Sequence, residues 1–573
     1  MSADLDLVIT GGTVVDGTGA ASRTADVAIA NGKVVAVGRV DASDAEERID
    51  ADGLLVTPGF VDIHTHYAAQ LHWDPTASPA SWHGVTTLMT GNCGFTLAPS
   101  KPDDLEWLLL MLSRVEGMSA DALRAGVAFR GGTLGEFLAG LDGRLGVNVG
   151  ANVGHCAVRR YVMGDDASER TATDDEIDQM CVLVRAAFDQ GAVGFTSSQL
   201  ELHVAHDGRG VPSNHASPEE LIALASVLAE VGRGSIEFIP RTFLNGYDDA
   251  DRELVLAMAR ASGRPVHLNT LTLLPHAPEG WSRSLEFAQL AHDAGLEVHP
   301  MFATNRQGAH FSLDSTFLFD EMPSFRDTLT LPEPSRCERL RDPALRERMR
   351  VEMADPSGRS FVFVWQVVAV EVVHRPEHES LVGRTVWDVA QELGADPLDT
   401  FLDLSLAEDL RMQFVLAAPP SPKRQAVVEA LINSPLVMAG SSDGGAHLLS
   451  FCGADYSTRL VSEWTPQVLS IEDAIARLTS IPAASYGITD RGTLEVGKAA
   501  DVLLIDRAQL SAGETPRYVR DFPAESGRYV VDATGYHSVI VNGETLLRDG
   551  ADTGRRAGVV LRGGSRFAGM VTP

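Results

Sequence analysis

Two histidines at the end of an apolar segment have the type and spacing of metal ligands. His64 and His66 close the run Pro58-Gly59-Phe60-Val61-Asp62-Ile63-His64-Thr65-His66, in which a Pro-Gly turn precedes strand-forming residues. Because side chains at i and i+2 of a strand share a face, the two imidazoles point the same way. Two neighbouring imidazoles are half of a coordination shell for a divalent metal ion. Surface or core histidines are the alternative, and the position at a strand end favours the metal site.

Two further candidates follow later apolar segments. Cys93 stands among glycines in Gly91-Asn92-Cys93-Gly94, where its thiolate would be a good zinc ligand. A buried structural cysteine is the alternative. Asp443 follows an apolar segment and precedes Gly444 and Gly445. A carboxylate beside a metal ion can take a proton from an activated water and deliver it to a leaving nitrogen, which makes Asp443 the candidate catalytic residue. An ordinary turn aspartate is the alternative.

Eight strand-like segments, most of them separated by helical stretches, predict the scaffold that would position these residues. They span residues 60–64, 85–90, 147–153, 192–196, 235–239, 265–269, 296–301 and 435–440. Eight β/α units favour an α/β fold, the closed (β/α)8 TIM-type barrel, whose active-site side chains lie at the carboxyl ends of its strands. We expect this barrel over residues 58–485. Prolines interrupt the pattern in residues 305–380, which predicts an insertion between strands seven and eight that could form a lid.

Short strands with tight turns at both ends of the chain predict a second, smaller domain. Residues 1–57 contain the pair Asn31-Gly32 between apolar runs, and residues 486–573 contain Asn542-Gly543 in the same setting. An Asn-Gly pair between such runs is a strong hairpin signal. We therefore expect one β-sandwich domain built from both termini, with two unrelated hairpins as the alternative.

The composition excludes several classes of protein. The 573-residue chain carries a net charge of −31, which disfavours binding to nucleic acid or to an anionic membrane. It contains no run of about 18 apolar residues that would span a membrane. The amino terminus has no basic segment followed by an apolar one, so we expect a cytoplasmic protein. The five cysteines are scattered without a C-x-x-C pair, which argues against a disulfide framework.

Several motifs together resemble the amidohydrolase superfamily, and more closely its N-acyl-D-amino-acid deacylase (D-aminoacylase) branch. The matching stretches are residues 59–66, 84–87, 91–94, 154–155, 191–197, 442–444 and 492–501. The resemblance covers nearly the whole chain. It implies a β-sandwich beside the barrel, zinc as the cofactor and hydrolysis of an amide carbon–nitrogen bond. It also implies that Cys93 is a metal ligand.

The chain departs from this branch at two customary ligands. The histidine that usually ends strand five corresponds to Ile239, and the histidine that usually ends strand six is missing or displaced. Glu237, a carboxylate within an apolar strand, either replaces a ligand or pairs with Arg241, since burying it alone would be costly. His267 is a further candidate ligand or an ordinary barrel histidine. One zinc ion held by His64, His66, Cys93 and Asp443 is the simplest outcome, and two ions are the alternative.

Three residues are expected to bind the substrate. Arg241 is retained where the branch has an arginine suited to a substrate carboxylate, and His299 occupies the approximate place of a branch tyrosine. His155 is the third candidate. The leading hypothesis is a zinc-dependent hydrolase of a linear N-acyl amide, such as an N-acyl-(D-)amino acid. A cyclic-amide hydrolase and a non-catalytic binding or scaffold protein are the alternatives. The expected partner is a small-molecule amide, and the chain could form a homo-oligomer.

Overall fold

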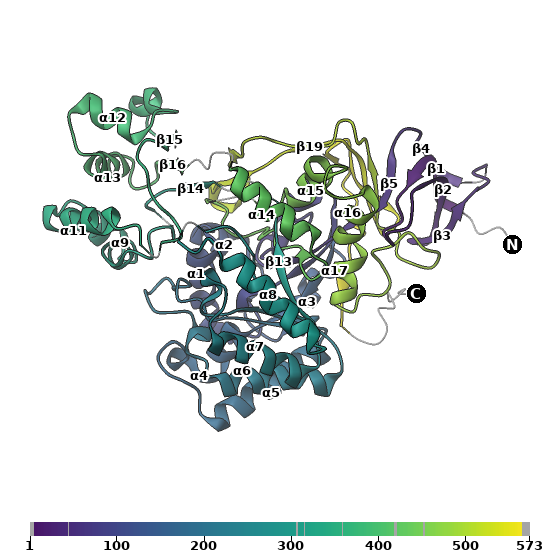
Figure 1. The fold of residues 1–573 in the computed structure, drawn as a ribbon, viewed down its shortest axis with the longest axis horizontal. Coiled ribbons are helices and arrows are strands. Elements are labelled where there is room, and N and C mark those ends of the chain that lie inside the picture. Colours follow the sequence, from purple (N-terminus) through teal and green to yellow (C-terminus); the bar gives the residue numbers. More distant parts are fainter. Residues whose placement is uncertain are drawn as a thin grey trace.

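A computed structural model describes residues 5–563, except for residues 44, 275, 305–307, 315, 358, 417–420 and 451–452. It has an α/β barrel at its centre, a β-domain at one end and a group of helices that projects at the other end (Figure 1). Within the described residues, every helix is too short or too polar to cross a lipid bilayer.

The central barrel contains the eight predicted strands. They are β6 (Phe60–Thr65), β7 (Val85–Thr90), β8 (Asn148–Ala151) with β9 (Val153–Gly154), β10 (Gly194–Ser198), β11 (Ser235–Ile239), β12 (Val266–Leu268), β13 (Val298–Phe302) and β17 (Met438–Ala439). The strands pair in parallel in chain order. A parallel bridge between Thr65 and Gly444 joins the loop after β17 to the end of β6. The prediction of a (β/α)8 barrel is confirmed, and the carboxyl ends of all its strands lie on one face.

Helices surround the barrel, and several of them begin at a side-chain cap. They are α1 (Leu105–Glu116), α2 (Ala120–Gly126), α3 (Leu134–Leu141), α4 (His155–Met163), α5 (Asp174–Asp189), α6 (Pro218–Val231), α7 (Asp249–Ser262), α8 (Gly280–Asp293), α14 (Pro422–Asn433), α15 (Tyr456–Trp464), α16 (Ile471–Leu478) and α17 (Ser480–Ser485). Thr173 and Glu176 form a reciprocal capping box at the start of α5. Ser217 caps α6, whose first residue is Pro218. These caps fix where each helix begins and therefore how long the preceding barrel loop is.

The β-domain is built from both ends of the chain, as predicted, but its main element is one nine-stranded sheet and not the two facing sheets of the predicted sandwich. Its strands are β1 (Leu5–Val14), β2 (Arg23–Ala30), β3 (Lys33–Gly38), β4 (Ala45–Asp50), β5 (Leu55–Pro58), β18 (Val502–Ile505), β23 (Tyr536–Val541), β24 (Glu544–Arg548) and β25 (Ala551–Asp552). The antiparallel pair β5–β18 joins the two halves, which excludes two unrelated hairpins. Asn31 and Gly32 both have positive φ, as a tight hairpin turn requires. The final strand β26 (Val560–Leu561) instead pairs with β8 of the barrel.

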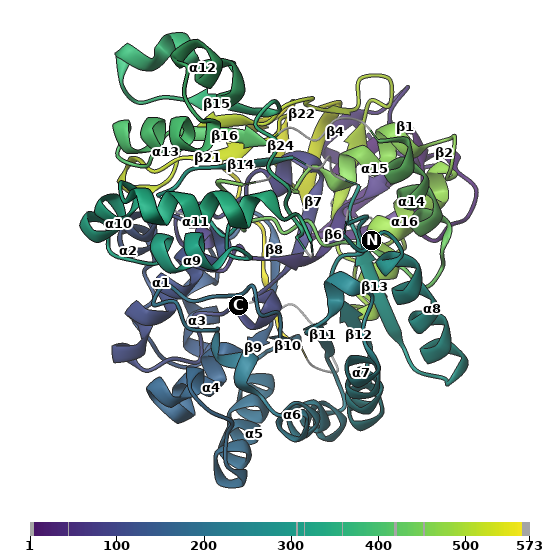
Figure 2. The same cartoon turned by 60° about the vertical axis from the view of Figure 1, so that its left-hand side comes forward.

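The insertion after β13 is longer than the expected residues 305–380. It comprises β14 (Ala309–Phe311), α9 (Pro323–Leu329), α10 (Glu333–Leu340), α11 (Pro343–Ala354), β15 (Val368–Val372), α12 (Val386–Leu393), α13 (Pro397–Ala407) and β16 (Gln413–Leu416). Strand β16 pairs with both β14 and β15, so the inserted unit closes only at Leu416. It has its own apolar core, which includes Phe311, Phe319 and Phe401. Figures 1 and 2 show its helices grouped on one side of the barrel. The prolines indicated where the insertion begins. Its end was predicted too early, because α12 and α13 have regular helical sequences that resemble barrel segments.

Candidate metal centre

His64 in β6 and His66 just after it turn toward each other at the carboxyl face of the barrel. Their Nε2 atoms are 3.3 Å apart, and both side chains are buried. The intervening Thr65 points away and donates its hydroxyl to Met89 O at 2.8 Å, as the two-residue strand period requires. The backbone N–H of His66 donates to Gly444 O at 2.7 Å. This bond ties the end of the first strand to the loop after the last strand.

Cys93 reaches the same point from the turn after β7. Its Sγ lies 3.5 Å from His64 Nε2 and 3.9 Å from His66 Nε2. Cys93 itself has φ 57°, in the left-handed region, and it is flanked by Gly91 at φ 85° and Gly94 at φ 82°. A Cβ at Gly91 would come within 2.6 Å of Thr96 Cγ2, so the turn that presents the thiol needs glycine there.

Asp443 completes the cluster from the loop after β17. Its Oδ1 lies 2.9 Å from His64 Nε2 and 3.6 Å from His66 Nε2. Burial alone would raise the pKa of Asp443, but the charge of His64 and the hydrogen bonds of both histidines outweigh burial and hold the pKa well below its usual range. The Asp443 side chain keeps 23% of its surface exposed, against none for His64 and 4% for His66. It is therefore the acidic group of the cluster that a ligand in the cavity can reach.

The donor atoms fit a tetrahedral metal ion. Those of His64, His66 and Cys93 all lie within 4.8 Å of one another. A tetrahedral ion with bonds of about 2.0 to 2.3 Å to nitrogen and sulfur separates its ligand atoms by about 3.3 to 3.7 Å. The three observed separations, 3.3, 3.5 and 3.9 Å, are close to these values. Two imidazoles, a thiol and a carboxylate that converge in a buried place form a donor set suited to zinc.

Two carboxylates lie against the residues of the donor cluster. Glu116, the last residue of α1, places Oε1 2.8 Å from His66 Nδ1, which leaves Nε2 facing the cluster. Glu237 on β11 accepts the Cys93 backbone N–H through Oε2 at 2.6 Å, and its Oε1 lies 3.8 Å from His64 Nδ1. Burial raises the pKa of Glu237 to about 7. Glu237 therefore lies at the edge of the donor cluster, and its expected pairing with Arg241 is wrong.

The customary histidines of strands five and six have neutral counterparts near the cluster. Ile239 and Asn269 line the cavity there, and Asn269 Nδ2 donates to Cys93 Sγ at 3.6 Å. His267 lies deeper in the barrel, beside Glu237 in the register of the sheet. Its ring stacks on Tyr486 at a centroid distance of 5.3 Å. Burial lowers the pKa of His267 to about 3, which keeps the ring neutral. His267 lies outside the described cavity lining and outside the donor cluster.

The structure does not bring the three predicted substrate-binding residues to the cavity. Arg241 forms an ion pair with Asp248 at 2.6 Å, with 45% of its side chain exposed. Strand β11 ends at Ile239, and Arg241 follows it after Pro240. The Arg241 side chain therefore lies against Asp248 at the start of α7 and not in the barrel interior. His299 is the second residue of β13, near the opposite end of the barrel, and its Nδ1 faces Leu436 O at 3.3 Å.

His155 is held inside the helix layer. Its Nδ1 lies 2.8 Å from Ser197 Oγ and its Nε2 lies 2.8 Å from Glu220 Oε1, so both ring nitrogens are engaged. Arg159 also pairs with Glu220, and all three charged or titratable side chains are fully buried. His155 is thus a packing residue in this structure. Its position in the sequence motif did not indicate this role, because its partner Glu220 is 65 residues away.

Replacing Glu220 by alanine tests this buried network. The change leaves the Arg159 charge without its partner inside the protein, and we expect the free energy of unfolding to fall by about 3 to 5 kcal/mol. Urea unfolding monitored by circular dichroism measures it. Asp166→Ala breaks an exposed ion pair with Arg170 and should leave the unfolding midpoint unchanged. Equal midpoints for the two variants would contradict the structural role.

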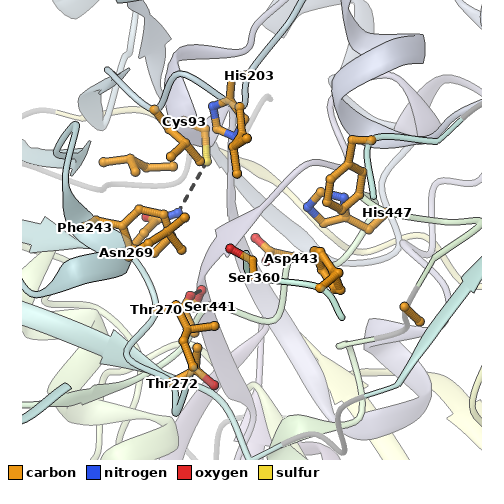
Figure 3. Close-up of a pocket in the computed structure, with 18 of the residues that line it drawn as sticks. Cys93, His203, Phe243, Asn269, Thr270, Thr272, Ser360, Ser441, Asp443 and His447 are labelled. Carbon is orange, nitrogen blue, oxygen red and sulfur yellow. Dashed lines mark hydrogen bonds between the residues drawn. The ribbon is translucent and has the colours of Figure 1, made fainter. Parts of the chain in front are cut away.

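A cavity of about 510 Å³ opens beside the cluster, lined by His66, Cys93 and Asp443 among others. Figure 3 shows Cys93, Asn269, Asp443 and His447 around it. His447 and Glu116 were not among the residues predicted for the site. His447 stands four residues after Asp443, which was a usable signal, and its ring packs on Phe317 of the insertion at a centroid distance of 4.9 Å. Glu116 ends an amphipathic helix, and nothing in its sequence surroundings pointed to His66.

Comparisons with known proteins identify the family of this chain. The sequence profile of the Amidohydrolase family matches residues 47–546. D-aminoacylase of Alcaligenes xylosoxydans xylosoxydans is 27% identical over 98% of each chain, and N-acyl-D-aspartate deacylase of the same organism is 28% identical over 98% of this chain and 96% of that protein. A crystal structure of D-aminoacylase superposes with a TM-score of 0.66 and 25% identity, covering 97% of this chain and 100% of that one.

A solved N-acyl-D-glutamate deacylase from Bordetella bronchiseptica, complexed with zinc and a phosphonate inhibitor, has the same TM-score of 0.66 and 25% identity and covers 98% of this chain. The family profile spans the barrel and part of the β-domain, including every member of the donor cluster. This chain therefore belongs to the amidohydrolase family.

Proposed function

We propose that this protein is a zinc-dependent hydrolase that cleaves a linear N-acyl amide, with an N-acyl-D-amino acid or a related compound as the substrate. The observation that carries the proposal is the convergence of His64, His66 and Cys93 with the accessible carboxylate of Asp443 beside a cavity. Relatives named as D-aminoacylase and N-acyl-D-aspartate deacylase, which align over nearly the full length of this chain, support a linear amide over a cyclic one.

The ligands would be Nε2 of His64, Nε2 of His66 and Sγ of Cys93, with Asp443 as the fourth group. When bound there, a zinc ion would polarise the amide carbonyl and lower the pKa of the attacking water. We propose a single ion, because Ile239 at the end of β11 and Asn269 just after β12 offer no ionisable ligand.

Asp443 handles the proton. A carboxyl group is ionised at neutral pH, so Asp443 can accept a proton from the attacking water. Because its side chain reaches the cavity, the same carboxyl group can then deliver the proton to the leaving nitrogen. The amine departs as a neutral molecule, and the carboxylate is regenerated for the next turnover.

Neighbouring residues hold the reacting groups in place. Glu116 fixes the orientation of the His66 ring, and the Asn269 amide donates to the Cys93 sulfur, which stabilises the thiolate form. His447 lines the cavity beside Asp443 and is half-buried. The polar hydroxyls of Thr270 and Ser441 lie on the same wall and form a hydrogen bond with each other. They are the neutral groups available to the polar part of a substrate.

Metal removal tests the proposal. Purified protein is expected to contain about one equivalent of zinc by elemental analysis, because three buried ligands hold it. Dialysis against dipicolinate should abolish release of carboxylic acid from N-acyl-D-amino acids, and one equivalent of zinc should restore it. A metal-free protein that hydrolyses these amides at the original rate would refute the metal mechanism. Turnover of hydantoins without turnover of linear amides would favour the cyclic substrate class. The cytoplasmic location and the homo-oligomer remain predictions from the sequence.

A further inference from the structure

The cavity beside the metal ligands has mainly apolar walls. One wall comes from the loops after β10 and β11, where Leu200, Ile239 and Phe243 line the space. The opposite wall comes from the insertion, where Phe317, Phe361, Val362 and Val367 line it. Hydroxyl side chains such as Thr270, Thr272 and Ser441 gather in one part of the cavity (Figure 3). A ligand that fills this space must present a large apolar surface.

The insertion wall ends in exposed valines. In residues 361–365, the ring of Phe363 stacks on Phe319 at a centroid distance of 4.3 Å, and Trp365 lies against Phe401 at 5.3 Å, so both rings pack against the insertion core. Val362 and Val367 face the cavity instead, and each keeps 38% of its surface exposed. Exposed valines at the mouth of an apolar cavity are costly in water, unless an apolar ligand covers them during function.

The charged side chains of the described cavity lining are already engaged. Arg114 donates to both carboxylate oxygens of Asp320, at 2.5 and 2.7 Å. Glu116 lies against His66, and Arg424 has an interaction partner as well. Arg241, where the family resemblance placed a carboxylate-binding arginine, lies outside the cavity in an ion pair with Asp248. These contacts favour an uncharged apolar occupant over an acidic side chain.

We infer that the substrate carries a long, linear apolar acyl chain, which runs from the metal centre along the insertion wall to Val362 and Val367. This inference rests on the proposed amide hydrolysis. A cavity of about 510 Å³ has the size of sites that hold drug-sized ligands, larger than an amino-acid side chain needs. The acyl group is the part of an N-acyl amide whose length is not limited by the amino acid, so it is the part that can fill the space.

A series of N-acyl-D-leucines tests the chain length. Acetyl, hexanoyl and decanoyl derivatives are assayed with the zinc-loaded protein below their micelle concentrations. Each buried methylene contributes about 0.8 kcal/mol, or about fourfold, so kcat/KM for the decanoyl substrate should exceed that for the acetyl substrate at least about 100-fold. Equal or falling values along the series would overturn the inference while leaving the proposed function intact. Failure of every substrate would instead count against the proposed function.

Variants of the insertion wall localise the acyl chain. Val362→Asp and Val367→Asp place a charge where the chain should lie, and each should lower the decanoyl-to-acetyl ratio of kcat/KM about tenfold. Val364→Asp is the matched control, since Val364 lies in the same segment, is 45% exposed and is not part of the cavity lining. It should leave the ratio unchanged. Because all three valines are already exposed, the variants are expected to fold. An unchanged ratio in both cavity variants, or an equal loss in Val364→Asp, would overturn the proposed path.

Discussion

The Asp443→Asn variant is expected to lower kcat for amide hydrolysis about 1,000-fold. Asparagine keeps the shape of the side chain and an oxygen near His64, but it cannot accept a proton from the attacking water or deliver one to the leaving nitrogen. Loss of general acid–base catalysis costs about 100-fold to 10,000-fold in rate. Steady-state kinetics on the N-acyl-D-amino acid that the wild type hydrolyses fastest would measure the change.

Zinc content separates proton transfer from metal binding in this variant. The remaining ligands His64, His66 and Cys93 should retain most of the ion, so kcat should stay low even in excess zinc. Recovery of the wild-type rate on adding zinc would show that Asp443 acts only as a ligand. Glu237→Gln is the comparison variant, since Glu237 is fully buried and Gln can still accept the Cys93 backbone N–H. We expect it to lower kcat at most about tenfold, through ligand orientation.

The Cys93→Ala variant is expected to lose the metal. The thiolate is one of three closely grouped donors, and alanine leaves only the two imidazoles and a partly exposed carboxylate. After dialysis against a zinc buffer, its metal content should fall below about a tenth of the wild-type value, and amide hydrolysis should fall with it. Elemental analysis of dialysed protein provides the measurement.

Cys156→Ala is the matched control for this loss. Cys156 is also a fully buried cysteine, but its Sγ lies 3.2 Å from Ser213 Oγ and outside the donor cluster. Its zinc content and activity should equal those of the wild type. Full zinc occupancy in Cys93→Ala would show that the thiol is not a ligand. Loss of zinc from both variants would point to a general effect on folding.

The sequence predicted the donor cluster better than the substrate-binding residues, for a physical reason. A strand has a period of two residues, so the shared face of His64 and His66 follows from their spacing alone. The carboxyl ends of parallel strands meet on one face of a barrel, so Cys93 and Asp443 could be expected beside them once eight β/α units were recognised. The predicted roles of Arg241 and His299 depended on the direction of a side chain just after a strand ends or near its start. The strand pattern does not specify this direction.

Contacts between distant segments account for what the sequence could not predict. The pairing of Glu116 with His66, and of Arg159 with Glu220, joins residues 50 and 61 positions apart. Their partners are chosen by packing of α1 and α6 against the barrel, so no local pattern encodes them. The same holds for the insertion, whose end at Leu416 was set by the pairing of β16 with β14 and β15.

By itself, then, the amino-acid sequence determined the barrel and the joint β-domain, and it placed His64, His66, Cys93 and Asp443 near strand ends as candidates for a metal site, because local periodicity and turn chemistry dictate strands and their ends. Only the tertiary structure decided which side chains face the cavity. In that structure an ion pair holds Arg241, and hydrogen bonds hold His155, away from the cavity. Apolar residues of the insertion line the cavity instead. The physical reason is that a side chain's direction depends on the partners that burial makes available, and those partners come from segments far away in the chain.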